Sequence, residues 1–229
     1  MEISQPQHTN RQYEEDLRGL RAGLLRMGGM VERQIVEAVE SLVNRNTEQA
    51  RETIQGDVEV NRLDTEMDQR CISLLALHQP TASDLRFITT GLKITTDLER
   101  IGDNAVNICE RAIELNTEPQ LKPYIDIPRM ADIAQTMVKD ALDAFMRGDI
   151  ELAAEVIARD DDVDQLNYQT YRELLSYMVE DPQTIPRATK ILFISKYLER
   201  IADHATNIAE MVVYMVKGRS IKHMDKHRA

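Results

Sequence analysis

The sequence predicts an all-α protein made of two tandem, internally repeated three-helix bundles. Three observations support this fold class. Apolar residues recur at spacings of three and four over long stretches of the chain. No stretch alternates apolar and polar residues between turn residues, so we expect no sheet. A thirteen-residue segment also occurs twice, since residues 98–110 read LERIGDNAVNICE and residues 198–210 read LERIADHATNIAE, with nine of the thirteen positions identical.

The duplication extends well beyond this segment. Residues 24–50 align without gaps to residues 127–153 at an offset of 103, and the offset falls to 100 at Leu98 and Leu198. The second half is therefore three residues shorter over this stretch, and we assign the missing residues to the loop at 181–185. Two copies of one architecture are therefore expected.

The first half reads as three helices. Apolar spacing from Leu20 to Leu42 marks the first helix. Asn46 with Gln49 forms a capping pair that opens the second helix, and Pro80 ends it because proline disfavours helix at the preceding residue. These signals predict helices over about 11–45, 47–78 and 82–115.

The second half repeats this plan behind a proline-rich linker. Pro119, Pro123 and Pro128 interrupt residues 116–128. Asp149 after Gly148 is the expected N-cap of the middle helix. The predicted helices cover about 129–147, 150–180 and 186–217. The resulting organisation is a disordered tail at 1–10, a first bundle at 11–115, the linker at 116–128, a second bundle at 129–218 and a basic tail at 219–229.

Composition and charge limit the classes of function. The net charge of −11 argues against nucleic acid as the main partner, because phosphate binding needs a basic surface. The sequence shows no signal peptide and no apolar run long enough for a membrane span, so we expect a cytoplasmic protein that reaches a membrane only through partners. Cys71 and Cys109 are expected to be buried thiols in a reducing compartment.

The repeated segment places carboxylates and an amide on one face of a helix. Glu99, Asp103 and Asn107 lie at about 0°, 40° and 80° around a helix of 3.6 residues per turn. Glu199, Asp203 and Asn207 repeat the arrangement. Oxygen ligands of this kind suit hard cations and iron-type sites.

The middle helix of each half carries a matching stripe. Asp57 and Asp64 flank Asn61 on one face, and their counterparts are Asp160, Asp164 and Asn167. Close carboxylates repel one another unless they are protonated or bridged by cations. The sequence therefore predicts metal ligands at Glu99, Asp103, Asn107, Glu199, Asp203, Asn207, Asp57, Asp64, Asp160 and Asp164, and the alternative is a solvated helix face.

Catalytic machinery is not apparent in the sequence. We find no nucleophile–base arrangement, no phosphate-binding glycine loop and no Glu-x-x-His pair of the di-iron proteins. A metal-dependent hydrolase or oxidase stays the alternative to a protein without enzymatic activity. His204 lies off the stripe and is expected on the surface or between helices, and Arg100 is expected to form a salt bridge or to be solvated. Gly28 and Gly29 are interpreted as packing residues.

Three motifs together resemble the PhoU family of bacterial regulators of phosphate uptake. They are the duplicated LERIxD, MGGMVE in the first helix and QPTASDLR at the start of the third. The resemblance extends from about Leu17 to Gly218. It implies two tandem three-helix bundles whose duplicated motifs bind multinuclear iron or zinc clusters, with Mg or Mn not excluded. The motif carboxylates would be Glu99, Asp103, Glu199 and Asp203, with Asn107, Asn207 and the aspartates of the middle helices nearby.

The same resemblance implies a regulatory adaptor rather than an enzyme. Its expected partners are the cytoplasmic subunits of the phosphate ABC transporter and a sensor histidine kinase. It would restrain uptake and keep the phosphate-starvation response off when phosphate is plentiful, and we expect a homodimer. One departure is Ala202, where the family pattern has glycine as at Gly102, and its methyl group narrows the approach of a facing helix.

Overall fold

The computed structural model describes residues 7–218, with side chains from Arg11 onward, and this range contains helices and no strand. The predicted all-α class is therefore confirmed. The tail segments 1–6 and 219–229 lie outside the described residues. The helices are α1 (Gln7–Val43), α2 (Thr47–Leu77), α3 (Ala82–Asn116), α4 (Asp126–Arg147), α5 (Ile150–Glu180), the short 3-10 helix η1 (Pro182–Thr184) and α6 (Ile185–Lys217).

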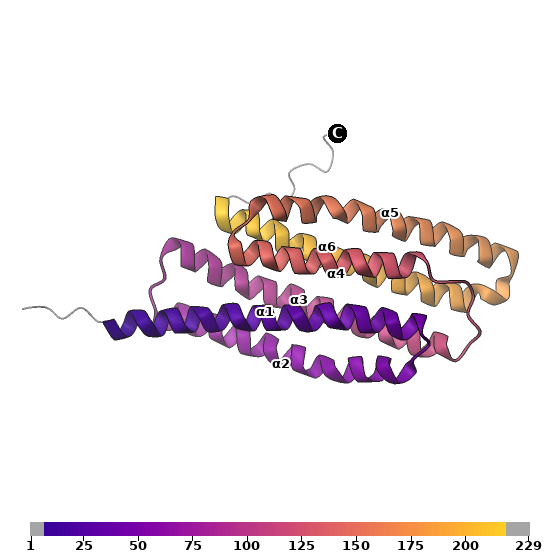
Figure 1. Ribbon diagram of the computed structural model, residues 1–229, viewed down its shortest axis with the longest axis horizontal. Helices are drawn as coiled ribbons and strands as arrows, with labels where there is room; N and C mark the ends of the chain where they lie inside the picture. The colour runs from indigo at the N-terminus through magenta and orange to yellow at the C-terminus, as the bar shows by residue number, and fades with distance from the viewer. Residues whose placement is uncertain (1–6, 219–229) are drawn as a thin grey trace, which may run out of the picture.

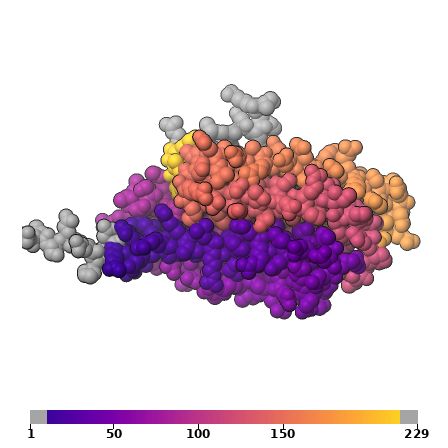
Figure 2. All heavy atoms as spheres, viewed as in Figure 1, coloured from indigo at the N-terminus to yellow at the C-terminus, as the bar shows by residue number. Residues whose placement is uncertain are grey.

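The two halves lie side by side along the length of the molecule (Figures 1 and 2). The three α-helices of each half all contact one another. Between the halves α1 contacts α4 and α3 contacts α6, while α2 and α5 lie on opposite outer sides. Buried apolar side chains form one cluster that includes residues of all six α-helices. The two bundles therefore share a core.

The repeated helices α3 and α6 run antiparallel where the halves meet (Figure 1). Arg86, near the start of α3, donates from Nε to the carbonyl oxygen of Met215, near the end of α6, over 2.9 Å. At the other end, the Lys190 ammonium of α6 lies 3.4 Å from a carboxylate oxygen of Glu114 in α3. The two copies of the repeated segment therefore lie on neighbouring helices of opposite direction.

Close packing joins α1 and α3 to α4. The rings of Phe87 and Phe145 stack with centroids 4.8 Å apart and an interplanar angle of 11°. A Cβ atom at Gly28 would lie 2.1 Å from Cδ1 of Leu142, whereas one at Gly29 would meet nothing within 4 Å. The packing interpretation is thus confirmed for Gly28, which lets α1 approach α4, and it is wrong for Gly29.

The predicted helix caps are present. Asn46 accepts a hydrogen bond from the backbone N–H of Gln49 over 3.1 Å, but the Gln49 side chain donates to Glu40 instead of completing a capping box. Asp149 accepts from two backbone N–H groups in the first turn of α5. Gly148 ends α4 with φ of 66°, a conformation that glycine adopts without strain. Local sequence therefore sets these helix ends.

Two predicted boundaries were wrong. α1 begins at Gln7 inside the predicted tail, because its first turns are polar and the apolar spacing gives no signal there; Arg11 and Glu15 pair at 3.2 Å across one turn. α4 begins at Asp126, so the loop spans 117–125 rather than 116–128. Pro128 lies in the first turn of α4, where its missing N–H has no helical partner to lose.

The second half lacks three residues that the first half has, and they are missing at a different place than predicted. α2 and α5 each contain 31 residues. The segments 78–81 and 181–184 that follow them are equally long. The deletion therefore falls between Ile185 and Leu198, in the first turns of α6. Three residues are close to one helical turn, so α6 loses them from its start while remaining helical.

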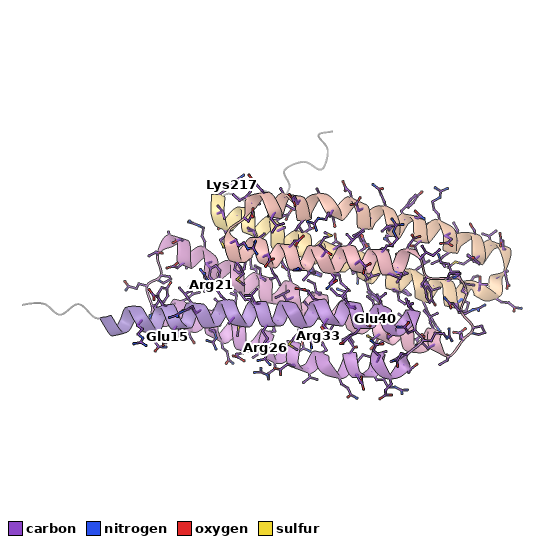
Figure 3. The ribbon with its side chains drawn as sticks, viewed as in Figure 1. Glu15, Arg21, Arg26, Arg33, Glu40 and Lys217 are labelled. Carbon is purple, nitrogen blue, oxygen red and sulfur yellow. The ribbon has the colours of Figure 1, made fainter. Side chains whose placement is uncertain are left out.

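Charged side chains lie along the exposed face of α1. Glu15, Arg26 and Arg33 are all exposed and project from this helix (Figure 3). Arg26 reaches α2, where its guanidinium lies 2.8 Å from a carboxylate oxygen of Glu59. Among the described residues, no helix has both the length and the apolar character needed to cross a membrane.

Candidate functional site

The second and third helices of each half contact one another, and both helices of each pair carry predicted carboxylates. We call those between α2 and α3 the first seam and those between α5 and α6 the second seam. Each pair of helices is in contact over its length. The first seam comprises Asp57, Asp64, Glu99 and Asp103, and the second seam comprises Asp160, Asp164, Glu199 and Asp203.

The first seam is centred on a buried aspartate. Asp57 of α2 is 8% exposed. It accepts hydrogen bonds from Nε2 of Gln34 in α1 over 3.1 Å and from Nδ2 of Asn61 over 3.0 Å. Gln34 is 6% exposed, and its Oε1 atom has no hydrogen-bond partner. A buried acceptor of this kind is costly unless a donor or cation satisfies it.

Burial is the main cause that raises the pKa values of the first-seam carboxylates Asp57, Asp64 and Glu99, and neighbouring negative charges raise them further. Burial raises the pKa of Asp57, and the charge of Asp103 raises it further. Burial also raises the pKa of Glu99, with added contributions from Asp103, Asp64 and Asp57, while Arg100 lowers it. For Asp64 the main cause of the raised pKa is again burial. The cluster therefore favours protons or cations over free carboxylates.

Arg100 compensates only part of this negative charge. Its guanidinium lies 3.4 Å from Glu99 and 3.1 Å from Asp103, and its side chain is 58% exposed. The predicted salt bridge of Arg100 is thus confirmed. The arginine stays at the solvent side of the seam, and no ion pair with Asp57 is formed.

Gly102 makes room for the first seam. A Cβ atom built on Gly102 would lie 2.9 Å from Oδ1 of Asp57, 3.3 Å from Oε1 of Gln34 and 3.5 Å from Cγ1 of Val60. Any larger residue would therefore displace the buried oxygens. The donors are all oxygens, one of them unpartnered, so the residues present fit a hard cation.

The present side-chain conformations do not form a closed ligand set. In the part of the chain that the structure describes, no three His, Cys, Asp or Glu side chains are arranged to hold a metal ion. Asn107 and Asn207 are partly buried further along α3 and α6. Of the predicted ligands, Asp57, Asp64, Glu99 and Asp103 of the first seam are close enough for their charges to act on one another.

The second seam is built differently. Glu199, whose side chain is 14% exposed, forms an ion pair with Lys196 one turn earlier in α6. Ser195 donates to Oδ1 of Asn167 over 2.6 Å. Asp160 is buried, whereas Asp164 and Asp203 are exposed. A cation from the chain itself, Lys196, therefore accompanies the one glutamate of this seam.

A further polar contact joins α3 and α6 near the seams, and the sequence analysis did not find it. Nδ1 of His204 in α6 lies 2.8 Å from Oδ1 of Asp97 in α3. The expectation that His204 lies between helices is confirmed. Asp97 was missed because its repeat counterpart is Tyr197, so the duplication gives no signal at this position.

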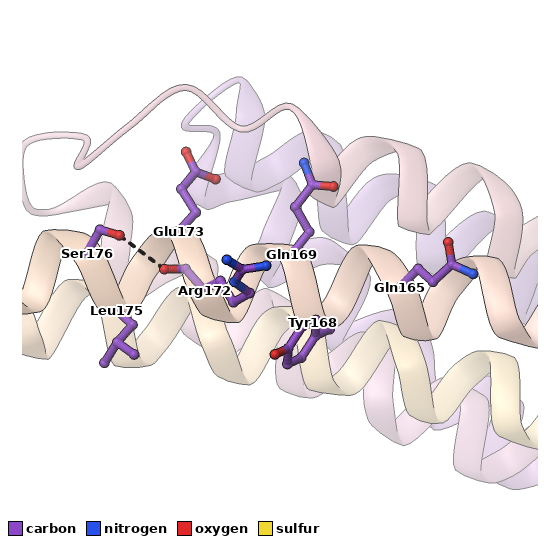
Figure 4. Close-up of a pocket in the computed structure, with 7 residues that line it drawn as sticks. All are labelled: Gln165, Tyr168, Gln169, Arg172, Glu173, Leu175 and Ser176. Atoms are coloured by element: carbon purple, nitrogen blue, oxygen red, sulfur yellow. Dashed lines mark hydrogen bonds between the residues drawn. The ribbon is translucent and has the colours of Figure 1, made fainter.

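A surface hollow of about 710 Å³ lies on the outer face of α5, away from the seams (Figure 4). Several of its polar side chains are engaged with neighbouring groups. The Ser176 hydroxyl donates to the carbonyl oxygen of Arg172, Arg172 lies 5.9 Å from the Tyr168 ring, and Glu173 pairs with the buried Lys122. No nucleophile and base are paired among the residues that line this hollow.

Comparison with known proteins gives a consistent family assignment. The family model described as PhoU domain matches residues 24–112 and 127–212, so it matches once in each half. A phosphate-specific transport system accessory protein PhoU homolog of Pseudomonas putida is 40% identical over 222 residues, which cover 96% of this chain and 87% of that protein. The homolog of Aquifex aeolicus is 44% identical over 209 residues, covering 91% of this chain and 95% of that protein.

Solved structures agree. The crystal structure of PhoU from Pseudomonas aeruginosa superposes with a TM-score of 0.87 at 41% identity, covering 90% of this chain and 100% of that chain. That of the phosphate transport system regulatory protein PhoU from Streptococcus pneumoniae gives a TM-score of 0.85 at 30% identity, covering 91% of this chain and 99% of that chain.

Proposed function

The chain belongs to the PhoU family, and we propose that it is a regulatory adaptor of a phosphate-specific transport system. The observation that carries this proposal is the match of the PhoU domain to both halves at close to full length. Relatives at this similarity are named accessory or regulatory proteins of phosphate transport. The seams hold carboxylates without a nucleophile beside them, which supports a binding role over a catalytic one.

In detail, the adaptor restrains the phosphate ABC transporter from its cytoplasmic side and keeps the phosphate-starvation response off through a sensor histidine kinase. It acts when phosphate is plentiful, as a homodimer. Long helices with exposed charged faces, such as α1, support protein partners. The net charge of −11 supports the exclusion of nucleic acid.

Capture from cells tests the adaptor role. The full chain, tagged and expressed at native level, is cross-linked and purified from phosphate-replete and phosphate-starved cells. We expect the transporter ATPase and the kinase in the replete sample. Recovery of neither protein, together with unchanged starvation-gene expression after deletion of the chain, contradicts the proposal. Sedimentation of the purified chain tests the homodimer.

A cation-binding role belongs to the same proposal. In the first seam Asp57, Glu99 and Asp103 would hold the ion with Asp64 beside them, and the unpartnered Gln34 oxygen supports this assignment. A bound cation would supply positive charge between α2 and α3. The family resemblance favours iron or zinc, whereas oxygen donors also suit Mn²⁺ or Mg²⁺. Elemental analysis of protein purified without chelator tests whether any of these metals is retained.

A further inference from the structure

The two seams differ in the charge that balances them. We propose that the first seam takes a divalent cation, whereas the second seam carries Lys196 as a built-in substitute and binds such a cation at least tenfold more weakly. This inference rests on the cation-binding part of the proposed function. It concerns residues in which the two halves of this chain differ.

The first difference is a charge. Lys196 pairs with Glu199, the glutamate of the second seam. Its counterpart in the first half is Thr96, which carries no charge and cannot pair with Glu99. Glu99 has only the solvent-side guanidinium of Arg100, which it shares with Asp103. Both pairing side chains are partly exposed, Lys196 by 48% and Arg100 by 58%. A cation bound by Glu199 would have to displace an ammonium that pairs with this glutamate alone, whereas in the first seam the single guanidinium is divided between Glu99 and Asp103.

The second difference is the donor that the first helix of each half contributes. Gln34 of α1 points an amide at Asp57 and leaves Oε1 unpartnered. The repeat offset of 103 places Met137 of α4 at the same position, and it is fully buried. A thioether is a soft, weak acceptor and a poor ligand for a hard cation. The second seam thus lacks the oxygen donor that the first helix of the half contributes to the first seam.

The third difference is space. A methyl group at position 102 would lie 2.9 Å from Oδ1 of Asp57, and Gly102 leaves this volume open. Ala202 of α6 is the repeat counterpart of Gly102, and its methyl group is fully buried. Along the middle helices the carboxylate changes place, since Asn167 replaces Asp64 and Asp164 replaces Asn61. Asn167 is bonded by Ser195. Charge, donor and space therefore all favour the first seam.

Titration of the full chain with Mn²⁺ alone tests this inference. Chelator-treated protein is titrated while the EPR signal of free Mn²⁺ reports binding. The matched variants are Asp57→Asn/Glu99→Gln in the first seam and Asp160→Asn/Glu199→Gln in the second. We expect the first pair to weaken the tightest Mn²⁺ binding at least tenfold and the second pair to leave it within about twofold. Equal losses in both variants, or no Mn²⁺ binding by the wild type, would overturn the inference.

A gain-of-binding variant keeps the test informative if a loss variant is unstable. Met137→Gln, Lys196→Thr and Ala202→Gly give the second seam the residues of the first, and we expect this triple variant to bind additional Mn²⁺. Unchanged stoichiometry in a folded triple variant, judged by circular dichroism, contradicts the inference. Partner capture is measured on the same proteins. If both seams bind Mn²⁺ equally and the wild type still captures its partners, only this inference is overturned. If the wild type captures no partner, the adaptor role is contradicted instead.

Discussion

Replacing Gly102 by alanine tests the close approach of α3 to the buried oxygens. The new Cβ would lie 2.9 Å from Oδ1 of Asp57 and 3.3 Å from Oε1 of Gln34. Overpacking of this kind costs about 1–3 kcal/mol. The higher helix propensity of alanine relative to glycine stabilises the folded state by about 1 kcal/mol. We therefore expect Gly102→Ala to lower the free energy of unfolding by about 1 kcal/mol.

Gly29→Ala is the matched control, because a Cβ at that position of α1 meets nothing within 4 Å. This variant gains the helix propensity without the overpacking, so its free energy of unfolding should rise by about 1 kcal/mol. The two variants should thus differ by about 2 kcal/mol, or roughly 4–8 °C in Tm for a chain of this size.

Urea unfolding of chelator-treated protein, followed by circular dichroism, measures this difference. Chelation matters because a bound cation would add its own contribution to the stability of the wild type. If Gly102→Ala stabilises the protein as much as Gly29→Ala does, then the first seam has room for a methyl group. The reasoning on the space beside Asp57 would then be refuted.

Three further predictions use other parts of the structure. Phe145→Ala should cost about 3–5 kcal/mol in urea unfolding, because it removes a buried ring stacked between the halves, and a cost below 1 kcal/mol would contradict a shared core. Burial raises the pKa of Cys71 and of Cys109 to about 12, so neither thiol should react with iodoacetamide at pH 8 until urea is added, as mass spectrometry would show. Burial raises the pKa of Asp57 and Glu99 in the fold, so the folded chain binds more protons than the unfolded chain above pH 4. Chelator-treated wild type should therefore gain stability relative to Asp57→Asn/Glu99→Gln as the pH falls from 7 to 5, and a relative loss would refute this sign.

The helices and the carboxylates of the seams were predictable because both depend on local spacing. A helical period places Glu99 and Asp103 on one face whatever surrounds them. The duplication then shows which polar positions are repeated. The caps at Asn46 and Asp149 follow from single residues and their neighbours. Helix starts such as Gln7 were not predictable, since a polar first turn lacks the apolar spacing used to find it.

Contacts between elements far apart in the chain were not predictable from the repeat. Gln34 enters the first seam from α1, although the sequence reasoning used only the second and third helices of each half. A signal existed, because Gln34 is a polar residue beside the apolar positions Val31 and Ile35 of the helix face turned to the core. The pairing of Asp97 with His204 depends on how the halves meet, and a sequence repeat does not specify that arrangement.

The helices that carry the repeated motif are also helices that join the halves. Glu99 lies on α3 and Glu199 on α6, and these two helices contact one another in opposite directions. Asp97 is two residues before Glu99, and His204 directly follows Asp203. The contact between Asp97 and His204 therefore lies next to both seams. A displacement of α3 that follows a change of charge at the first seam would therefore act directly on α6. The duplication has therefore placed two seams of different composition beside the contact between α3 and α6, where a change of charge in either seam can influence the packing of the halves.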